Sequence, residues 1–574
     1  MTTTRRNLFK LAGGAAAGSL LTPAPWRLIT DTALLSENWP GVPRPKRGEV
    51  SYRFGNCALC TAGCAVRARC VAGQPVALAG VEAHPLSRGA LCTYGIAGHH
   101  LPYHPARLRQ GPVAEASAAV QSAIRTLRPN EHCAVLDLRP GRTASWTYRR
   151  AMASVRNGMY LASESNTAVD LASAKTVLSL GVPVLDGWGT PGNVWALRGG
   201  FHLIQAEPVE SRTAVMADLW LPIRAGSEAA LLDAVRGGSA SDAAAQTGLS
   251  EQQIASLARE LRENGPSLVL DRNGASPMIA RREAPVPEEW KKAVPATQLA
   301  SVSEESIRVL LIDESMPGEY LPWSAIQPKL TSDCVVVSFA WSKEGYGRQA
   351  RFTLPAAVYP EVVDDIPPAI DSPAAMFRLA AALVAPPEGM VSPTGFIAGL
   401  AGIDAKNALQ ERVAAIQKSG RGSVFDPSGA AKPADLWKAL QAGATWIDDR
   451  EPRASVISTQ IASPLADDKN RSSAPLAIAF SEPRAAALVS PLMSKVTNES
   501  GLRLGTHGVA IHPSDARGAG LAEGSRARLE TASGFVTVDI SVDDTVPPGV
   551  IQVGGGPDLQ NVCGANRRGR VVAL

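Results

Sequence analysis

Four cysteines near the start of the chain have a spacing that could bind metal. Cys57, Cys60 and Cys64 fall within the segment CALCTAGCAVRARC, and Cys92 follows in GALCTYG, which gives the pattern C-x2-C-x3-C-x27-C. Thiolates bind iron and zinc, and a pair of thiols can oxidise to a disulfide. The residue type and the spacing therefore leave three alternatives to compare.

A cubane [4Fe–4S] cluster agrees with this spacing better than zinc or disulfides. It needs four thiolates, of which three can come from one compact loop and the fourth from a distant position. Structural zinc usually uses two short C-x-x-C pairs, and here the second half of the pattern supplies only Cys92. Disulfides within the tight first loop have awkward geometry. We predict one [4Fe–4S] cluster whose irons are bound by Cys57, Cys60, Cys64 and Cys92.

The remaining cysteines and a cluster of histidines have structural interpretations. Cys70 lies outside the spacing and is expected to be a small apolar strand residue, and Cys334 in CVVVSF is expected at a buried strand position. The segment HHLPYH brings together three histidines, His99, His100 and His104, but its prolines make it a poor helix. We therefore interpret this segment as a structural linker rather than a metal site.

One glycine motif could indicate a nucleotide site. GWGTPG contains Gly187, Gly189 and Gly192 in a G-x-G-x-x-G pattern before a helix, and Glu207 closes a later strand. However, the preceding strand is expected to end near Gly181, too early to lead directly into the glycine loop. The motif is therefore weak support for dinucleotide binding.

The first 35 residues are typical of an export signal. Arg5 and Arg6 precede a weakly apolar, Ala/Gly-rich stretch from about Leu8 to Leu21. TRRNLFK resembles a twin-arginine motif in which Leu8 and Phe9 are exchanged, and an amphipathic N-terminal helix is the alternative. A twin-arginine signal suits a protein that folds and acquires its cofactor before export, so we expect a periplasmic location.

The composition excludes several classes of function. The chain has 574 residues, 45% apolar and 19% charged, which predicts a globular protein of three or four domains. A net charge of +4 and only 5% aromatic residues give no support for nucleic-acid binding. No run of eighteen strongly apolar residues occurs, so the mature chain is not expected to span a membrane.

The elements that must position the cysteines alternate between strands and helices. Buried strands are expected in HCAVLDL, AKTVLSLG, FHLIQAE, PSLVLD, IRVLLID and CVVVSFA, and helices in VAEASAAVQSAIRTL, WTYRRAMASV, NVWALRGG, SPAAMFRLAAALV and PADLWKALQAG. This order predicts an α/β fold with parallel sheets covered by helices. From about residue 485, GVAIHP, GSRARLETASGFVTVDISV and GVIQVG predict a small β-barrel.

Several segments resemble the molybdopterin oxidoreductases that bind a bis-pterin guanine dinucleotide. The cysteine pattern with HPLSRGALCTYGIAGHHLPYHPARL is similar to that family's iron–sulfur domain. FHLIQAEPVESRTAVMADLWLPIRAGSEAALL, TLPAAVYPE and SPLMSKVTNESGLR are similar to later segments of the family. The resemblance implies a 4Fe–4S domain at 48–111, two Rossmann-like α/β domains within 112–480 and a C-terminal β-barrel at 485–574, after the signal region 1–35.

Three departures from the family pattern bear on molybdenum. The lysine that usually follows the fourth cysteine is replaced by Tyr94, which has no fixed positive charge. The segment that usually carries the molybdenum ligand is missing, because SVRNGMYLASESN passes directly into TAVDLASAKTVLSLG. The family's DPR reads AEPVESR, so its arginine is absent or shifted to Arg212. A molybdenum centre needs a pocket, a ligand and phosphate-binding groups together, so we expect the pterin dinucleotide to be absent.

The resemblance is greatest to the molybdenum-free large subunits of menaquinone reductase and alternative complex III. It implies an electron-transfer or scaffold subunit of a membrane-associated respiratory complex, without a substrate site of its own. The implied partners are an iron–sulfur protein, a multihaem cytochrome c and a quinone-binding membrane subunit, through which alone the chain would contact the membrane. The alternatives are a molybdopterin-dependent enzyme acting on an inorganic oxyanion or sulfur compound, and a zinc-stabilised binding protein.

Overall fold

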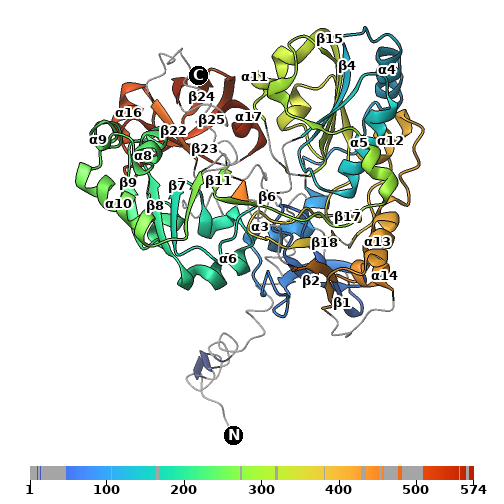
Figure 1. Cartoon of the computed structure of the whole chain (residues 1–574), viewed down its shortest axis with the longest axis horizontal. Coiled ribbons are helices and arrows are strands. Elements are labelled where there is room, and N and C mark those ends of the chain that lie inside the picture. Colours follow the sequence, from blue (N-terminus) through green and yellow to red (C-terminus); the bar gives the residue numbers. More distant parts are fainter. Residues whose placement is uncertain are drawn as a thin grey trace.

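Figure 1 shows the computed structural model of the chain, in which the strands form separate sheets. The barrel strands β22 (Leu476–Phe480) to β25 (Gly534–Val542) lie on one side of the view, and strands β4 (His132–Asp137) and β15 (Leu330–Ala340) lie on the other. The structure describes residues 47–104, 106–162, 167–271, 274–316, 318, 321–380, 382–427, 435–450, 456–457, 476–480, 508–554, 556–563 and 568–574, with 9–10, 13–14 and 18 near the N-terminus. The twin-arginine-like pair Arg5–Arg6 and the segment SPLMSKVTNESGLR lie outside the described residues.

The N-terminal part of the fold is a three-stranded antiparallel sheet. Its strands are β1 (Val50–Asn56), β2 (Ala65–Val71) and β3 (Gln74–Gly80), in that order. The short helices α3 (Thr93–Ala97) and η1 (Gly98–Tyr103) follow. Cys70 lies in β2 with no exposed surface, which agrees with the prediction of a small apolar strand residue. Cys334 also lies in a strand, but it is only partly buried, so the prediction of a buried position is wrong.

A six-stranded parallel sheet forms one of the two large α/β layers. Its order is β13 (Ala296–Thr297), β5 (Gly158–Leu161), β4 (His132–Asp137), β14 (Ile307–Glu314), β15 (Leu330–Ala340) and β16 (Phe352–Pro355). Every neighbouring pair is parallel, as the βαβ pattern predicts. The helices α4 (Val113–Arg125), α5 (Thr143–Ser154) and α12 (Pro393–Leu400) cover one face of the sheet.

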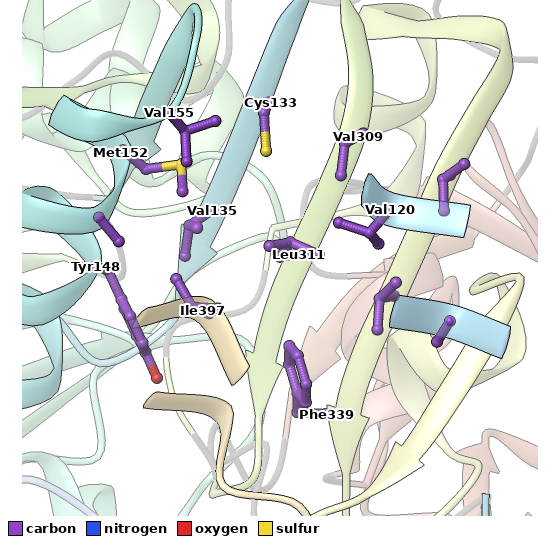
Figure 2. Packing of buried hydrophobic residues seen from close by; sticks show 14 of the residues in the cluster. Val120, Cys133, Val135, Tyr148, Met152, Val155, Val309, Leu311, Phe339 and Ile397 are labelled. Atoms are coloured by element: carbon purple, nitrogen blue, oxygen red, sulfur yellow. The ribbon is translucent and has the colours of Figure 1, made fainter. Parts of the chain in front are cut away.

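The core of this layer is built from the continuous apolar runs of its central strands. Figure 2 shows Val135 of β4, Leu311 of β14 and Phe339 of β15 facing Tyr148 and Ile397 from the covering helices. On the other face, residues of α11 (Trp323–Ile326), η5 (Leu299–Ser301) and η7 (Gly345–Arg348) belong to a second apolar cluster. The turn η6 (Gln327–Lys329) follows α11 and contributes no buried residue. Burial on both faces explains why these strands read as unbroken apolar segments.

A five-stranded sheet forms the second α/β layer. Its order is β11 (Gly274–Ser276), β10 (Ser267–Asp271), β7 (Thr176–Leu180), β8 (His202–Glu207) and β9 (Leu219–Pro222), and only the β10–β11 pair is antiparallel. The helices α8 (Glu228–Val235), α9 (Ala240–Thr247) and α10 (Glu251–Glu263) cover one face. The turn η2 (Val184–Trp188), α6 (Pro191–Leu197), η3 (Arg198–Gly200) and α7 (Arg212–Val215) follow β7 and β8.

A four-stranded sheet corrects one sequence prediction. Its order is β17 (Asp364–Asp365), β18 (Ala375–Ala380), β20 (Thr445–Asp448) and β19 (Ser423–Phe425), and α13 (Ala408–Ser419) and α14 (Leu436–Gln441) pack against it. The helix predicted for SPAAMFRLAAALV is therefore wrong, because residues 375–380 form a strand. Every residue of β18 is buried, and a short apolar run buried on both faces carries no period that distinguishes strand from helix.

The C-terminal part is a closed barrel, as predicted. Its strands follow the order β22 (Leu476–Phe480), β26 (Val550–Val553), β23 (Gly508–Ile511), β25 (Gly534–Val542), β24 (Arg526–Thr531) and β27 (Arg568–Ala573), and β27 pairs with β22. The helices α16 (Pro513–Gly518) and α17 (Pro557–Cys563) accompany it. A small sheet of β21 (Val456–Ile457), β12 (Met278–Ala280) and β6 (Thr167–Ala168), and the turn η4 (Glu288–Lys292), complete the described elements. Within the described part of the chain, no helix is both long and apolar enough to cross a membrane.

Candidate functional site

Three of the four spaced cysteines lie on one tight loop at the end of the first hairpin. Strands β1 and β2 pair until Asn56 stands opposite Ala65, so residues 57–64 must turn back within a short span. The backbone N–H of Cys57 donates to the carbonyl of Cys64 over 2.9 Å, and the N–H of Gly63 donates to that of Cys60 over 3.3 Å. Gly63 has φ +52°, a left-handed conformation that favours glycine. The hairpin therefore gathers Cys57, Cys60 and Cys64 on one loop.

The fourth cysteine reaches the same place from the start of α3. Cys92 immediately precedes this helix, and its carbonyl accepts a hydrogen bond from the N–H of Ile96 over 2.9 Å. All four cysteines line one pocket, with about 430 Å³ of empty volume that includes open solvent. Cys57 and Cys64 are buried, whereas Cys60 and Cys92 are partly exposed. The structure thus brings together all four residues that the spacing singled out.

The rest of the pocket wall is small or apolar. It consists of Leu59, Ala62, Gly63, Leu91, Tyr94, Gly187, Gly189 and Pro191. Tyr94, which stands where the family has lysine, is buried in the apolar cluster that also contains Cys57 and Tyr359. Gly187, Gly189 and Pro191 come from the segment that follows β7, so the second α/β layer closes one side of the pocket.

Burial makes free thiolates in this pocket unfavourable. It raises the pKa of both the Cys57 and the Cys64 thiol well above the ordinary value, and the neighbouring cysteines raise these pKa values further. Arg378 opposes the shift at Cys64. Four thiolates could therefore coexist here only if a positively charged group shared the pocket.

The four cysteines line the pocket without closing around one point. Among the residues that the structure describes, no group of three or more His, Cys, Asp or Glu side chains converges as the ligands of a single metal ion. The histidines of HHLPYH are engaged by the protein: His99 Nδ1 lies 3.0 Å from the Ile96 carbonyl, and His104 packs edge-on against Trp341. Burial lowers the pKa of His99 to about 4, and the adjacent His100 contributes to this lowering.

A second place where ligands commonly bind is the carboxyl edge of the six-stranded sheet. The connection that follows β4 leads to β5 on one side, and the connection that follows β14 leads to β15 on the other. Strands β4 and β14 therefore flank a switch point, which is the usual place of the ligand crevice in open α/β sheets. A network of charged side chains fills this edge, and we call it the edge network. It consists of Asp137, Arg139, Arg142, Asp313, Asp364, Asp365 and Arg412.

Arg142 is the centre of the edge network. Its guanidinium lies 3.2 Å from the Asp137 carboxylate, 2.7 Å from that of Asp313 and 2.8 Å from that of Asp364. Burial alone would raise the pKa of Asp313, but Arg142 and hydrogen bonds from neighbouring side chains outweigh it and hold this pKa below the ordinary value. Arg142 and Asp313 therefore form a charged pair inside the protein.

The N-terminus of helix α5 is occupied by a carboxylate of the chain itself. Both oxygens of Asp365 accept from the backbone N–H of Thr143 over 2.9 Å, and Arg412 lies 3.0 Å from the same carboxylate. A helix N-terminus at a switch point is otherwise a favourable place for a phosphate group. Here Asp365 takes that place.

The edge network also carries no excess positive charge. It contains three guanidinium groups, on Arg139, Arg142 and Arg412, and four carboxyl groups, of which Asp365 has its pKa raised by burial. Arg139 is buried, and among the described residues its three guanidinium nitrogens have no hydrogen-bond partner, although Asp364, Asp313 and Asp137 are close enough to act on its charge. A diphosphate entering this edge would therefore meet an electrostatically balanced site.

The corresponding helix of the second layer is capped in the same way. At the start of α6, Asp371 accepts from the Thr190 N–H over 2.9 Å, from the Thr190 hydroxyl over 3.2 Å and from Asn193 Nδ2 over 2.9 Å. A Cβ on Gly189 would lie 2.7 Å from the Asp371 carboxyl carbon, and one on Gly192 would overlap the Ser87 carbonyl. The glycines of GWGTPG thus allow the chain to approach itself closely. Strand β7 ends at Leu180, close to the predicted end.

Sequence reasoning missed the acidic and basic residues that complete these sites. Asp365, Asp371 and Arg378 lie far along the chain from the residues they contact, and no local pattern marks them. Arg212, to which the family's arginine was expected to have shifted, forms an ion pair with Asp186 on the η2 turn.

Comparison with known proteins shows which class of protein this fold resembles. Residues 492–571, most of the C-terminal barrel region, match the Molydopterin dinucleotide binding domain family. The whole fold is similar to that of acetylene hydratase from Pelobacter acetylenicus, with a TM-score of 0.61 at 15% sequence identity, covering 90% of this chain and 95% of that one. These similarities confirm the α/β fold with a C-terminal barrel and the resemblance to molybdopterin oxidoreductases.

Two curated proteins are similar in sequence. The menaquinone reductase molybdopterin-binding-like subunit of Nitratidesulfovibrio vulgaris is 25% identical over 94% of this chain and 92% of its own length. A sulfite dehydrogenase subunit of Allochromatium vinosum is 25% identical over 33% of this chain and 24% of its own length. The first similarity extends over nearly the entire chain.

Proposed function

We propose that the chain is an iron–sulfur subunit of a membrane-associated respiratory oxidoreductase complex, in which it transfers electrons or serves as a scaffold. The observation that carries this proposal is the pocket shared by Cys57, Cys60, Cys64 and Cys92. A cubane distributes four thiolate ligands around four irons, so it needs cysteines on the walls of a common space, whereas a single zinc needs them converged on one point. The chain-length similarity to a menaquinone reductase subunit supports the assignment to a complex.

Within this proposal, the protein binds and shields the cluster. A bound [4Fe–4S] cluster supplies one-electron transfer. Cys57 and Cys64 hold the buried side, and the small residues Ala62 and Gly63 let the backbone approach the sulfurs and tune the potential. Cys60 and Cys92 are the more exposed ligands, so electrons would leave the pocket on their side.

We further propose that the molybdenum site has been lost. A pterin dinucleotide does not fit the carboxyl edge of the six-stranded sheet, because Asp365 caps helix α5 and the edge network balances its own charges. Asp371 caps α6 in the second layer. Such a protein would have no substrate site of its own. Its expected partners are an iron–sulfur protein, a multihaem cytochrome c and a quinone-binding membrane subunit, and its expected location is the periplasm.

The match of residues 492–571 to the dinucleotide-binding family favours a second candidate, a molybdopterin-dependent oxidoreductase acting on an inorganic oxyanion or sulfur compound. Metal analysis of the full-length protein purified without oxygen distinguishes the candidates. About four irons per chain without molybdenum, together with a cluster EPR signal on reduction, would support the first proposal. One molybdenum per chain with a released guanine nucleotide would support the second, and zinc alone would overturn both.

A further inference from the structure

A buried arginine lies directly behind the cysteine loop. Arg378 belongs to strand β18, which the Asn56 side chain at the end of β1 contacts by donating to the Leu379 carbonyl over 3.0 Å. The Arg378 side chain has no exposed surface. Strand β18 thus brings a guanidinium group from the C-terminal half of the chain to the back of an N-terminal loop.

The guanidinium group is held against the loop by specific contacts. Its Nη2 donates to the carbonyl of Thr61, between the second and third cysteines, over 2.7 Å. It also packs on Gly63 so closely that a Cβ at that position would overlap it. Gly63 is therefore required for its left-handed φ and for the approach of Arg378.

Much of the charge of Arg378 is not satisfied by hydrogen bonds. Its Nε and Nη1 atoms have no hydrogen-bond partner among the described residues. Asp371 acts on its charge, but that carboxylate also accepts from Thr190 and Asn193. A fully buried cation is costly unless negative charge lies nearby, and the other groups that act on it are the sulfurs of Cys64, Cys60 and Cys57.

The pocket wall itself contains no Lys or Arg among the residues that the structure describes. Arg378 contacts Gly63 and Thr61, so it places a positive charge directly against the loop that carries three of these cysteines. Reduction adds one negative charge to an iron–sulfur cluster, and nearby positive charge stabilises the reduced form.

We propose that Arg378 is a positioning residue that raises the reduction potential of the cluster and fixes the cysteine loop around it. This inference rests on the proposed function, because it requires that the four cysteines bind an iron–sulfur cluster. It goes beyond that function because it assigns to one residue an effect on the reduction potential of the cluster.

A redox titration of the full-length protein, followed by EPR, tests this role. In Arg378→Gln the positive charge is lost, and we expect the ratio of reduced to oxidised cluster at a fixed applied potential to fall at least about tenfold, which is about 59 mV for a one-electron couple. Arg378→Lys keeps the charge and should retain most of the wild-type potential. Arg412→Gln is the control and should leave the potential unchanged, since this buried arginine pairs with Asp365 over 3.0 Å, away from the cysteine loop.

A second variant tests the role even if Arg378→Gln does not fold. Gly63→Ala keeps the arginine but displaces the guanidinium from the loop, so the potential should move in the same direction. Wild-type iron content with an unchanged potential in Arg378→Gln, or in Gly63→Ala where the first variant is unstable, would overturn the role of Arg378 and leave the proposed function standing. Wild-type protein without an iron–sulfur cluster would overturn both.

Discussion

The cysteine pocket and the carboxyl edges of the two α/β sheets handle buried charge in opposite ways. At the edges, the chain supplies its own counter-charges, with Asp365 capping α5, Asp371 capping α6 and Arg142 joining three carboxylates. Four cysteines line the pocket, and Arg378 behind their loop donates to the Thr61 carbonyl, while its Nε and Nη1 have no hydrogen-bond partner among the described residues. The difference is that Arg139 and Arg142 at the edge lie beside several carboxylates of the chain, whereas the carboxylate acting on Arg378, that of Asp371, also caps α6.

The largest effect is expected when the pocket loses a ligand. Cys92→Ser should lose most of its bound iron together with the visible absorbance, because a serine hydroxyl is a poor ligand for the cluster. Iron content and absorbance of the purified protein measure this. Cys70→Ala is the control, since Cys70 is buried in β2 away from the pocket wall and its variant should keep its iron. A full iron complement in Cys92→Ser would remove Cys92 from the ligand set.

Breaking the edge network should destabilise the fold without affecting iron. Arg142→Met removes the ion pairs of the buried carboxylates of Asp137 and Asp313, and removal of one partner from a buried ion pair costs about 3–5 kcal/mol. Denaturant unfolding measures the loss. The exposed pair of Arg526 and Asp539 provides the contrast, because Arg526→Ala should cost less than about 1 kcal/mol. Equal losses of unfolding free energy in the two variants would show that the buried network contributes no more to stability than an exposed ion pair.

A fall in pH should lower the stability of the folded chain through His84, which lies in the segment before Cys92. Nδ1 of His84 accepts from the backbone N–H groups of Leu86 and Ser87, and burial with the nearby charge of Arg378 lowers its pKa from 6.5 to about 3. Between pH 3 and pH 6.5, His84 therefore binds more protons in the unfolded chain than in the folded one. The stabilisation of the folded state by neutral His84 is complete above pH 6.5 and is lost as the pH falls toward 3. His84→Asn, which keeps an acceptor but does not titrate, should flatten the decline in the unfolding midpoint between about pH 7 and about pH 4.5. An equally steep decline in this variant would exclude His84 as the cause.

The smallest effect concerns one hydrogen bond at the second edge. Thr190→Val removes the hydroxyl bond to Asp371 but keeps the backbone bond and that of Asn193, so the loss should be about 0.5–1.5 kcal/mol. Asp371→Ala removes all three bonds and should cost clearly more in the same unfolding measurement. If Thr190→Val cost as much as Asp371→Ala, the backbone cap of α6 would have no separate role.

Local sequence patterns predicted most of the fold. The alternation of apolar strands and helices indicated the parallel sheets, and short strands separated by Gly/Pro turns indicated the barrel. The exception is β18, where SPAAMFRLAAALV was interpreted as a helix. Its pairing with β20 depends on residues about seventy positions later, and no local preference encodes that contact.

The cysteines of the site could be predicted because their spacing is itself the signal. Arg378 could not, because it lies in the misassigned strand and meets Thr61 across 317 positions of the chain. Asp365 and Asp371 are ordinary acidic residues in the segment DDIPPAIDSP, and only the tertiary fold shows that each caps a helix. Charge compensation between distant segments is therefore the part of this protein that sequence patterns did not reveal.

The short stretch from Asp364 to Asp371 has a mechanical consequence. Within eight residues it is bound to α5 of the first α/β layer and to α6 of the second, through buried hydrogen bonds at both ends. A motion that moved α5 and α6 apart would strain these bonds. The stretch therefore connects the two layers and limits how far they can separate. Constant separation suits a protein that holds a redox group at a set distance from its neighbours and does not open and close around a substrate.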